Sequence, residues 1–420
     1  MGMIMEIQRQ FYLGELIRKQ RNGFVKVITG LRRCGKSYLL RTIFKKYLFA
    51  HGFLPEQIVE MAFDERDNKK FRDPDTFYEF AKRKLALRPD TVFLLDEIQL
   101  LDDFESVLNG LLGKKAEIYA TGSNAKFLSK DIITEFRGRG DEIHMTPLSF
   151  AEYYSFFNDD KISRFHEYML YGGLPPVALA SAPEDKIAIL NSLYTETYLR
   201  DIVGRNKIRK VAELENLLDI LSSVIGSLVN PEKLRKTFHS VKHSKLTADT
   251  IAKYISYLED AYLLEAAQRY DIKGKAYIET PLKYYYSDLG LRNARLKFRQ
   301  LEETHSMENI IYNELRHRRF NVDIGQIEVN EKNADGTYSR RQLEVDFVAN
   351  KGSKRYYIQS AYMIPDEGKR EQEIRSLLRI DDSFKKIVIT SHAPAPLYDD
   401  HGILTMSIYD FLLDRDSLDL

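Results

Sequence analysis

Residues 30–37, which read GLRRCGKS, constrain the fold of this chain more than any other segment. The pattern is G-x-x-x-x-G-K-S, with an apolar run at 25–29 before it and an amphipathic helical pattern at 38–44 after it. A strand, a glycine-rich loop and a helix in this order form a phosphate-binding loop. Glycine lets the backbone wrap around phosphate oxygens, and amides at the helix N-terminus donate hydrogen bonds to them. The segment therefore predicts an α/β domain that binds a nucleotide.

The residue types in this loop assign the first chemical roles. We expect Lys36 to reach the β- and γ-phosphates and the Ser37 hydroxyl to bind Mg²⁺. The predicted cofactors are accordingly ATP and Mg²⁺. The rest of the predicted nucleotide-binding set is Gly30, Arg33, Cys34, Gly35 and Tyr38.

A second strand supports this prediction. Residues 91–95 (TVFLL) form a continuous apolar run, typical of a parallel strand that is covered on both faces, and Asp96 and Glu97 follow it. An acid at the tip of a strand beside a phosphate loop can hold Mg²⁺, and the next acid can polarise the attacking water. We therefore expect Asp96 in the metal site and Glu97 as a catalytic residue.

A third strand is predicted at 117–121, and polar residues and arginines follow it. Ser123 or Asn124 could contact the γ-phosphate or position water, and the alternative is that they cap the next helix. Arg137 and Arg139 lie in the glycine-rich turn FRGRG. They suit an arginine finger that acts on the nucleotide of a neighbouring subunit or on its own, and the alternative is a solvated turn.

The segments TGLRRCGKSYLL, FLLDEIQ, YATGSNAKFLS, FRGRGDEIHMTPLSFAEYY and YGGLP together resemble a widespread group of prokaryotic AAA+-type ATPases. These are known as predicted ATP-binding proteins with a C-terminal domain of uncharacterised function. The resemblance covers nearly the whole chain. It implies an AAA+ core, a helical lid, a winged helix and a nuclease-fold C-terminus. It also implies nucleotide and Mg²⁺ roles for Lys36 and Ser37, the second motif at Asp96 and Glu97, a sensor at Ser123 or Asn124, and a finger at Arg137 or Arg139.

Composition limits the alternatives. The chain has 420 residues, enough for several domains, and a formal net charge of +1, so nucleic-acid or membrane binding requires local patches. One cysteine excludes an intramolecular disulfide and fits a reducing cytoplasm. The N-terminus lacks the apolar core of a signal peptide, and no apolar run approaches the roughly 18–20 residues of a membrane span. We expect a cytoplasmic, multidomain protein that does not bind membranes.

The expected domains are an AAA+ P-loop core at 1–155, a helical lid at 156–204, a winged-helix module at 205–290 and a C-terminal domain at 291–420. The winged-helix pattern consists of helices at 211–229, from Pro231 and at 248–258, followed by short strands around 272–275. A basic stretch could follow DNA phosphates; it comprises Lys233, Arg235, Lys236, His239, Lys242, His243 and Lys245. The presumed recognition helix carries Asp249, however, so docking of a protein partner remains the alternative.

The segment EVDFVANKGSKRYYIQSA at 344–361 indicates two strands around a turn. With helices at 307–315 and 371–378 and a final strand at 386–390, it resembles a restriction-endonuclease-like, PD-(D/E)XK fold. In active members a helix acid, a strand acid and a Glu-x-Lys pair converge on metal. Glu308 or Glu314 matches the helix acid and Asp346 the strand acid, but Gln359 and Ala361 replace the last pair. We expect a degenerate site, and a nuclease with a displaced lysine is the alternative.

The leading functional hypothesis is a Mg²⁺-dependent ATPase of AAA+ type that couples hydrolysis to binding of nucleic acid or a protein complex. The alternatives are an ATP-regulated, metal-dependent DNA nuclease and a nucleotide-gated adaptor with slow turnover. The partners considered are ATP, DNA bound through the winged helix and the C-terminal domain, a protein, and further copies of this chain.

Overall fold

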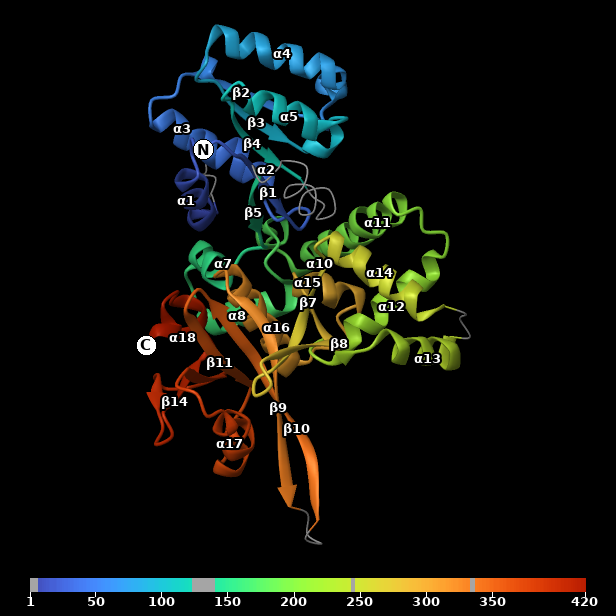
Figure 1. Cartoon of the computed structure of the whole chain (residues 1–420), viewed down its shortest axis with the longest axis vertical. Coiled ribbons are helices and arrows are strands. Elements are labelled where there is room, and N and C mark those ends of the chain that lie inside the picture. The colour runs from blue at the N-terminus through green and yellow to red at the C-terminus, as the bar shows by residue number, and fades with distance from the viewer. Residues whose placement is uncertain (1–6, 123–139, 243–245, 333–336) are drawn as a thin grey trace. The chain divides into compact units, whose positions relative to one another are not determined.

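The computed structural model describes residues 7–122, 140–242, 246–332 and 337–420 (Figure 1). The chain forms two compact units. The first comprises the described residues up to Leu148 together with Leu174–Pro176 and Glu259–Leu263. The second comprises the described residues of Ser149–Gly173, Val177–Leu258 and Leu264–Leu420. Both contain a β-sheet and helices, so the predicted α/β class is confirmed.

The first unit contains a five-stranded parallel sheet in the order β2-β3-β4-β1-β5. The strands are β1 (Val25–Gly30), β2 (Ile58–Ala62), β3 (Val92–Asp96), β4 (Glu117–Thr121) and β5 (Gly140–Met145). Every residue of β1 and β3 is buried, as expected for strands covered on both faces. The strands predicted at 25–29, 91–95 and 117–121 are therefore confirmed.

Strand β4 lies between β1 and β3, which decides where the functional residues meet. Ile28 of β1 is in register with Thr121 of β4, and Leu95 of β3 is in register with Ala120. Because the strands are parallel, their carboxyl ends lie at one edge of the sheet, where ligands bind in open α/β sheets. The phosphate loop, Asp96 and Thr121 therefore share that edge.

Helices cover this sheet. The helix after the phosphate loop is predicted at 38–44; it runs as α2 (Lys36–Tyr38), a π-helical stretch (Leu39–Phe44) and α3 (Lys45–Ala50). The remaining helices of the unit are α1 (Gln10–Arg18), α4 (Pro74–Leu87) and α5 (Phe104–Leu112), with short 3₁₀ turns at Pro55–Gln57, Arg66–Arg72 and Ile98–Leu100. Helices α4 and α5 belong to one apolar core with β3 and β4, in which Phe77, Leu108 and Phe93 are fully buried.

The second unit is built on a nine-stranded mixed sheet in the order β13-β14-β12-β11-β10-β9-β7-β8-β6. Strand β7 pairs in parallel with β9, so the β7–β8 hairpin and the C-terminal strands form one sheet. The sheet therefore crosses residue 290, where the sequence pattern places a domain boundary. The strands are β6 (Leu228–Val229), β7 (Leu264–Asp271), β8 (Ala276–Tyr286), β9 (Asn321–Lys332), β10 (Tyr338–Lys351), β11 (Lys354–Ala361), β12 (Lys385–Thr390), β13 (Leu397–Tyr398) and β14 (Ile403–Ser407).

Figure 1 labels the helices of the second unit except α9. Those before the β7–β8 hairpin are α7 (Phe150–Phe157), α8 (Lys161–Tyr171), α9 (Pro175–Ala178), α10 (Pro183–Ser192) with a π-helical continuation (Leu193–Leu199), α11 (Arg200–Arg205), α12 (Val211–Ser223), α13 (Pro231–Lys242) and α14 (Ala248–Asp260). Those after it are α15 (Leu289–Arg295), α16 (Glu303–His317), α17 (Glu367–Ile374) and α18 (Ile408–Leu413), with 3₁₀ turns at Leu377–Arg379 and Ser417–Asp419. The first two residues of α9 belong to the first unit.

Three predicted element limits are wrong. The helix predicted at 211–229 ends at Ser223, because Gly226 adopts φ +71° and Leu228–Val229 pairs with β8. The helix predicted at 371–378 begins earlier, since the Asp366 carboxylate accepts a hydrogen bond from the Lys369 amide at 2.8 Å and caps α17. The strand at 386–390 is not the last one, because β14 pairs in parallel with it.

Replacing Gly30 by alanine tests how the phosphate loop leaves the sheet. Gly30 has φ +128°, and a Cβ there would lie 2.0 Å from the backbone oxygen of Met145 on β5. Such a backbone conformation costs about 1–3 kcal/mol in a residue other than glycine, and the overlap adds to it. We expect Gly30→Ala to lower the free energy of unfolding by more than that amount in urea denaturation.

Gly14→Ala in α1 is the matched control. A Cβ at Gly14 meets nothing within 4 Å, so this helical substitution is expected to stabilise the protein by about 0.5–1 kcal/mol. Equal unfolding midpoints for the two variants would contradict the role given to Gly30.

Candidate functional site

The phosphate loop joins the end of β1 to the start of α2. Arg33 and Gly35 adopt left-handed backbone angles, φ +67° and +104°, and the helix begins at Lys36. Cys34 is fully buried, and its Sγ contacts the Met145 carbonyl oxygen at 3.4 Å. Arg33 and Tyr38 are exposed. The loop therefore combines a core-facing residue with side chains that face solvent.

Lys36 points back into this loop. Its ammonium donates hydrogen bonds to the carbonyl oxygens of Gly30 and Leu31, both at 2.9 Å, and the residue is 5% exposed. The backbone carbonyls thus hold the ammonium inside the loop, where the motif requires a positive charge for phosphate oxygens.

Asp96 lies next to Ser37 at the edge of the sheet. The Ser37 hydroxyl donates to Asp96 Oδ1 at 2.9 Å, the Thr121 hydroxyl donates to the same oxygen, and Arg41 Nη1 is 3.8 Å from Oδ2. Burial raises the pKa of Asp96 above its ordinary value, although these two hydroxyls and Arg41 lower it in part. A carboxylate beside a hydroxyl is a donor set of hard oxygen atoms, which suits Mg²⁺.

Glu97 follows Asp96 in a left-handed conformation with φ +54°. Its backbone amide donates to Thr121 Oγ1 at 3.1 Å, and the Gln99 side-chain amide donates to its carboxylate. Non-glycine residues in this conformation are uncommon and concentrate at functional sites. Because the Thr121 hydroxyl donates to Asp96 and accepts from the Glu97 amide, it links both acids of the second motif.

Sequence reasoning did not select Thr121 or Arg9 for the site. Thr121 ends the strand beside β3, so the rule that predicted Asp96 also applies to it. Arg9 donates to the Cys34 carbonyl oxygen at 3.3 Å and to the Thr146 carbonyl oxygen at 2.6 Å, and it is 3% exposed. It thereby ties the phosphate loop to the segment after β5. An arginine before an amphipathic helix gives no signal of such a role in the sequence.

Comparison with known proteins identifies the family. Residues 22–154 match the model of an AAA domain, and residues 162–302 match a domain of unknown function, DUF8612. An uncharacterized protein of Haemophilus influenzae is 34% identical over 414 residues, which cover 97% of this chain and 98% of that protein. This chain belongs to the same family. An uncharacterized protein of Methanocaldococcus jannaschii is 28% identical over 408 residues, 92% of this chain and 85% of its own length.

A solved structure, the ORC1 protein of Aeropyrum pernix in complex with DNA, is similar with 13% identity. The match covers 69% of this chain and 92% of that chain, with a TM-score of 0.28.

Three predicted catalytic residues of the AAA domain, Asn124, Arg137 and Arg139, lie outside the described residues, as does Ser123. The residues predicted for a degenerate nuclease site are described: Glu308 and Glu314 lie on α16, Asp346 on β10 and Gln359 on β11. Glu314 bonds Arg318 at 2.7 Å, and Arg318 also donates to the Arg415 carbonyl oxygen, so Glu314 serves the packing of the C-terminal segment.

Glu308 and Asp346, by contrast, lie around Lys283 of β8. Glu308 bonds Lys283 at 2.9 Å, and Asp346 Oδ2 accepts from the Ser360 amide at 2.8 Å. Gln359 Oε1 lies 3.5 Å from the Asp346 amide nitrogen. Within the residues that the structure describes, no group of three or more acidic, histidine or cysteine residues is arranged to hold a metal ion. No helix in the described part of the chain is long and apolar enough to cross a membrane.

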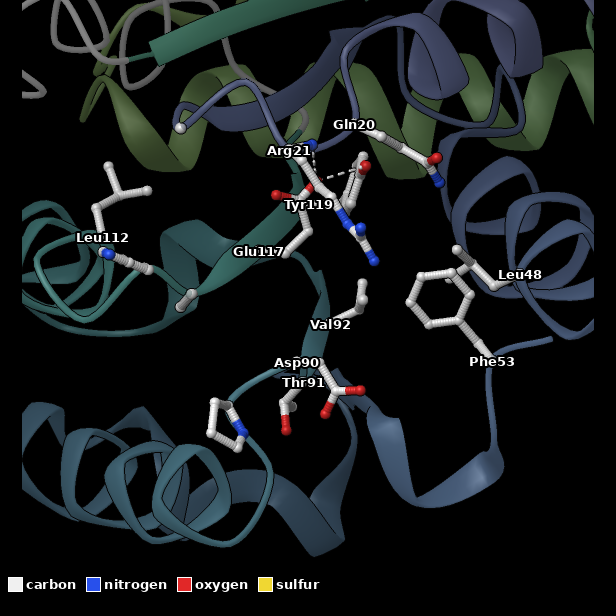
Figure 2. Close-up of a pocket in the computed structure, with 14 residues that line it drawn as sticks. Gln20, Arg21, Leu48, Phe53, Asp90, Thr91, Val92, Leu112, Glu117 and Tyr119 are labelled. Carbon is white, nitrogen blue, oxygen red and sulfur yellow. Dashed lines mark hydrogen bonds between the residues drawn. The ribbon is translucent and has the colours of Figure 1, made fainter. Parts of the chain in front are cut away.

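The AAA domain also contains a cavity of about 550 Å³ at the amino ends of its strands, shown in Figure 2. Thr91 and Glu117 line it beside β3 and β4, and Figure 2 shows the Arg21 side chain directed into it. Lys26 bonds Glu117 at 2.7 Å. Because nucleotides bind at the carboxyl ends of parallel strands, this cavity is separate from the phosphate loop.

Neutralising Asp96 is expected to stabilise the AAA domain. The folded-state pKa of Asp96 is raised, so its favourable contribution is present at low pH and is lost as pH rises through the folded-state pKa. Asp96→Asn removes the buried charge and keeps an oxygen that accepts from both hydroxyls. We expect a higher free energy of unfolding at pH 7, by about 1.4 kcal/mol for each pKa unit of the rise, and no gain near pH 3.

The measurement is thermal denaturation across this pH range without nucleotide or divalent cations. Asp73→Asn is the matched control: Asp73 caps α4, accepting from the Thr76 amide at 2.8 Å, and its pKa is lowered by its bonds to Thr76. Asparagine caps helices equally well, so no stabilisation is expected there. An Asp96→Asn protein that is less stable than wild type at pH 7 would refute the conclusion that the buried Asp96 charge destabilises the fold.

Proposed function

We propose that this protein is a Mg²⁺-dependent ATPase of AAA+ type that couples ATP hydrolysis to binding of nucleic acid or of a protein complex. The observation that carries this proposal is the meeting of the phosphate loop, Asp96 and Glu97 at one edge of a parallel sheet. The match of residues 22–154 to an AAA domain supports it.

Binding of ATP would use the loop first. Backbone amides around Gly35 and at the start of α2 would donate to phosphate oxygens, and Lys36 would exchange its two carbonyl acceptors for the β- and γ-phosphates. Ser37 and Asp96 would hold Mg²⁺, which when bound neutralises charge that develops on the phosphates. Arg9 would keep the Cys34 carbonyl in place and with it the shape of the loop.

Hydrolysis would then depend on Glu97. Its carboxylate would orient and polarise the attacking water, and the Gln99 amide would hold the carboxylate in position. Asn124 as sensor and Arg137 or Arg139 as finger are proposed from their sequence positions alone. A finger acting on a neighbouring subunit would require a homo-oligomer.

The second unit would couple this cycle to a partner. Helices α12, α13 and α14 followed by the β7–β8 hairpin have the order of a winged helix, which we propose as the docking module. Lys233 and Lys236 of α13 are exposed, whereas Arg235 is paired with Glu232 at 2.6 Å. We therefore also propose that α13 contacts DNA through its exposed lysines.

One observation favours a second candidate, a nucleotide-gated adaptor that docks a protein. The exposed positions of α14, which would enter a DNA groove, include Asp249, Ala252, Lys253 and Ser256. One acidic and one basic residue give this face no excess of positive charge. None of these positions carries an arginine or an asparagine that could read the edges of DNA bases. Such a face suits a protein surface better than a phosphate backbone.

Phosphate release from Mg²⁺-ATP tests the central claim. Loss of a general base or of a phosphate-binding charge costs about 10²–10⁴-fold in rate, so Lys36→Ala and Glu97→Gln are each expected to fall by at least 10²-fold. Glu97→Gln is expected to retain ATP binding, because the glutamine keeps the shape of the site. A measurement of fluorescent-nucleotide binding checks that expectation.

Lys69→Ala, which changes an exposed lysine of the same unit, is the control and is expected to hydrolyse ATP at the wild-type rate. Equal rates for wild type and Lys36→Ala would rule the proposal out. The assay is repeated with duplex DNA: a higher rate supports coupling to nucleic acid, and an unchanged rate supports the protein-docking adaptor.

A further inference from the structure

Lys283 of β8 lies among the acids that the sequence pattern assigns to a nuclease-type metal site. Its ammonium is 2.9 Å from Glu308 Oε1 on α16 and 2.7 Å from Glu344 Oε1 on β10. Lys283 is 4% exposed, so these carboxylates replace most of its water. One positive charge thus bridges acids from two different elements.

The carboxylates of Glu308 and Asp346 also have protein partners other than Lys283. Glu308 Oε1 also accepts from the Tyr285 hydroxyl at 2.6 Å, and His305 Nδ1 lies 3.5 Å from Glu308 Oε2. Asp346 lies at a β-bulge of β10, and its Oδ2 accepts from the Ser360 amide. Both oxygens of Glu308 and one oxygen of Asp346 therefore already lie beside protein partners.

Electrostatics agrees with this geometry. Burial lowers the pKa of Lys283, but the carboxylates of Glu308, Asp346 and Glu344 outweigh it and raise the pKa well above its ordinary value. Burial raises the pKa of Glu308, yet Lys283 and its hydrogen-bond donors bring it below its ordinary value. The lysine and this glutamate therefore form a charged pair at neutral pH.

Access to the cluster is restricted as well. Glu308 is 5% and Asp346 8% exposed. The loop between α12 and β6 covers part of it, since a Cβ at Gly226 would lie 2.7 Å from His305 Nδ1 and 3.0 Å from Glu308 Oε2. The side chain of Glu344 is 39% exposed, so the cluster opens to solvent at Glu344, whereas Glu308 and Asp346 are almost completely covered.

A divalent cation does not fit this arrangement. Oxygen ligands bind Mg²⁺ or Ca²⁺ at about 2.0–2.6 Å, and the Lys283 ammonium occupies the space between the two glutamates at hydrogen-bond distance. Ala361, which stands where a nuclease has its lysine, is 3% exposed and packs in the apolar core with Tyr357 and Val388. The positive charge therefore comes from β8 and not from β11.

We infer that the Lys283 ammonium is the built-in cation of a largely buried carboxylate cluster and takes the place of a metal ion in the C-terminal sheet. The sheet is then a metal-independent scaffold that does not cleave nucleic acid. The same ion pairs fasten the β7–β8 hairpin to α16 and β10, so the hairpin and the C-terminal strands act as one body. This inference does not depend on the ATPase activity.

Tyrosine-sensitised Tb³⁺ luminescence of the full-length protein, without nucleotide, tests the inference. The chain has 26 tyrosines and no tryptophan, and Tyr285 touches the cluster, so a lanthanide bound there would be detected. Wild type, Asp346→Asn and Glu308→Gln are expected to give the same titration curve, because the cluster binds no cation. A wild-type signal that either substitution weakens would overturn the inference.

Lys283→Ala removes the internal cation and is expected to create a Tb³⁺ site. Adding Asp346→Asn to that variant should weaken the new binding by about tenfold or more, because even the outer-shell partners of metal ligands are worth about 10–100-fold in metal affinity. A folded Lys283→Ala protein without new binding would contradict the inference. If Lys283→Ala does not fold, the wild-type comparison still decides.

A plasmid-relaxation assay with Mn²⁺ provides an independent check. Wild type is expected to leave supercoiled DNA intact. Relaxation that is lost in Asp346→Asn would show a working metal-dependent nuclease and would overturn the inference. Lys283→Met combined with Glu308→Gln and Glu344→Gln removes the charge of the lysine and the charges of the two glutamates that it bonds. This variant is expected to melt above Lys283→Met alone, because the single change leaves the buried Glu308 carboxylate without its cation.

Discussion

The shared hydrogen bonds of Asp96 hold the proposed nucleotide site together. Ser37 follows β1, Asp96 ends β3 and Thr121 ends β4, and the two hydroxyls donate to one carboxylate oxygen. Because β4 lies between β1 and β3, this oxygen joins the ends of three strands at the edge where the phosphate loop begins. The position of Glu97 depends on the same threonine, and Arg9 fastens the loop from its other side.

Asp96 and Glu308 are buried carboxylates with different partners. Asp96 has mainly neutral hydroxyl partners, and its pKa stays raised, so a cation that arrives with a nucleotide would be stabilised beside it. Glu308 has a lysine partner, and its pKa is lowered. A buried carboxylate without a cationic partner destabilises the folded state, whereas pairing with a lysine offsets much of that cost. The first arrangement suits chemistry and the second suits a scaffold.

Much of the fold could be predicted from local patterns. The strand pattern at 25–29 predicted β1 and the continuous apolar run at 91–95 predicted β3, and α13 begins at Pro231 as expected from the fixed φ of proline. The errors arose where local pattern and tertiary pairing disagree. Leu228 and Val229 fit the helical periodicity of the preceding segment, but their backbone groups pair with β8. Likewise, the short strands predicted around 272–275 belonged to a winged-helix pattern, and only the pairing of β7 with β9 shows that the hairpin extends the C-terminal sheet.

The sequence by itself determined the phosphate loop and the paired acids Asp96 and Glu97, because their chemistry depends on fixed spacing within one strand, loop or helix. It also showed that Ala361 stands where a nuclease of this fold has its lysine. Only the tertiary structure decided that Thr121 contacts Asp96, that Arg9 contacts the phosphate loop, that Glu314 pairs with Arg318, and that Lys283 lies among the acids of the cluster. These contacts bring together residues from different elements, and no local pattern records which side chains will meet once strands and helices pack.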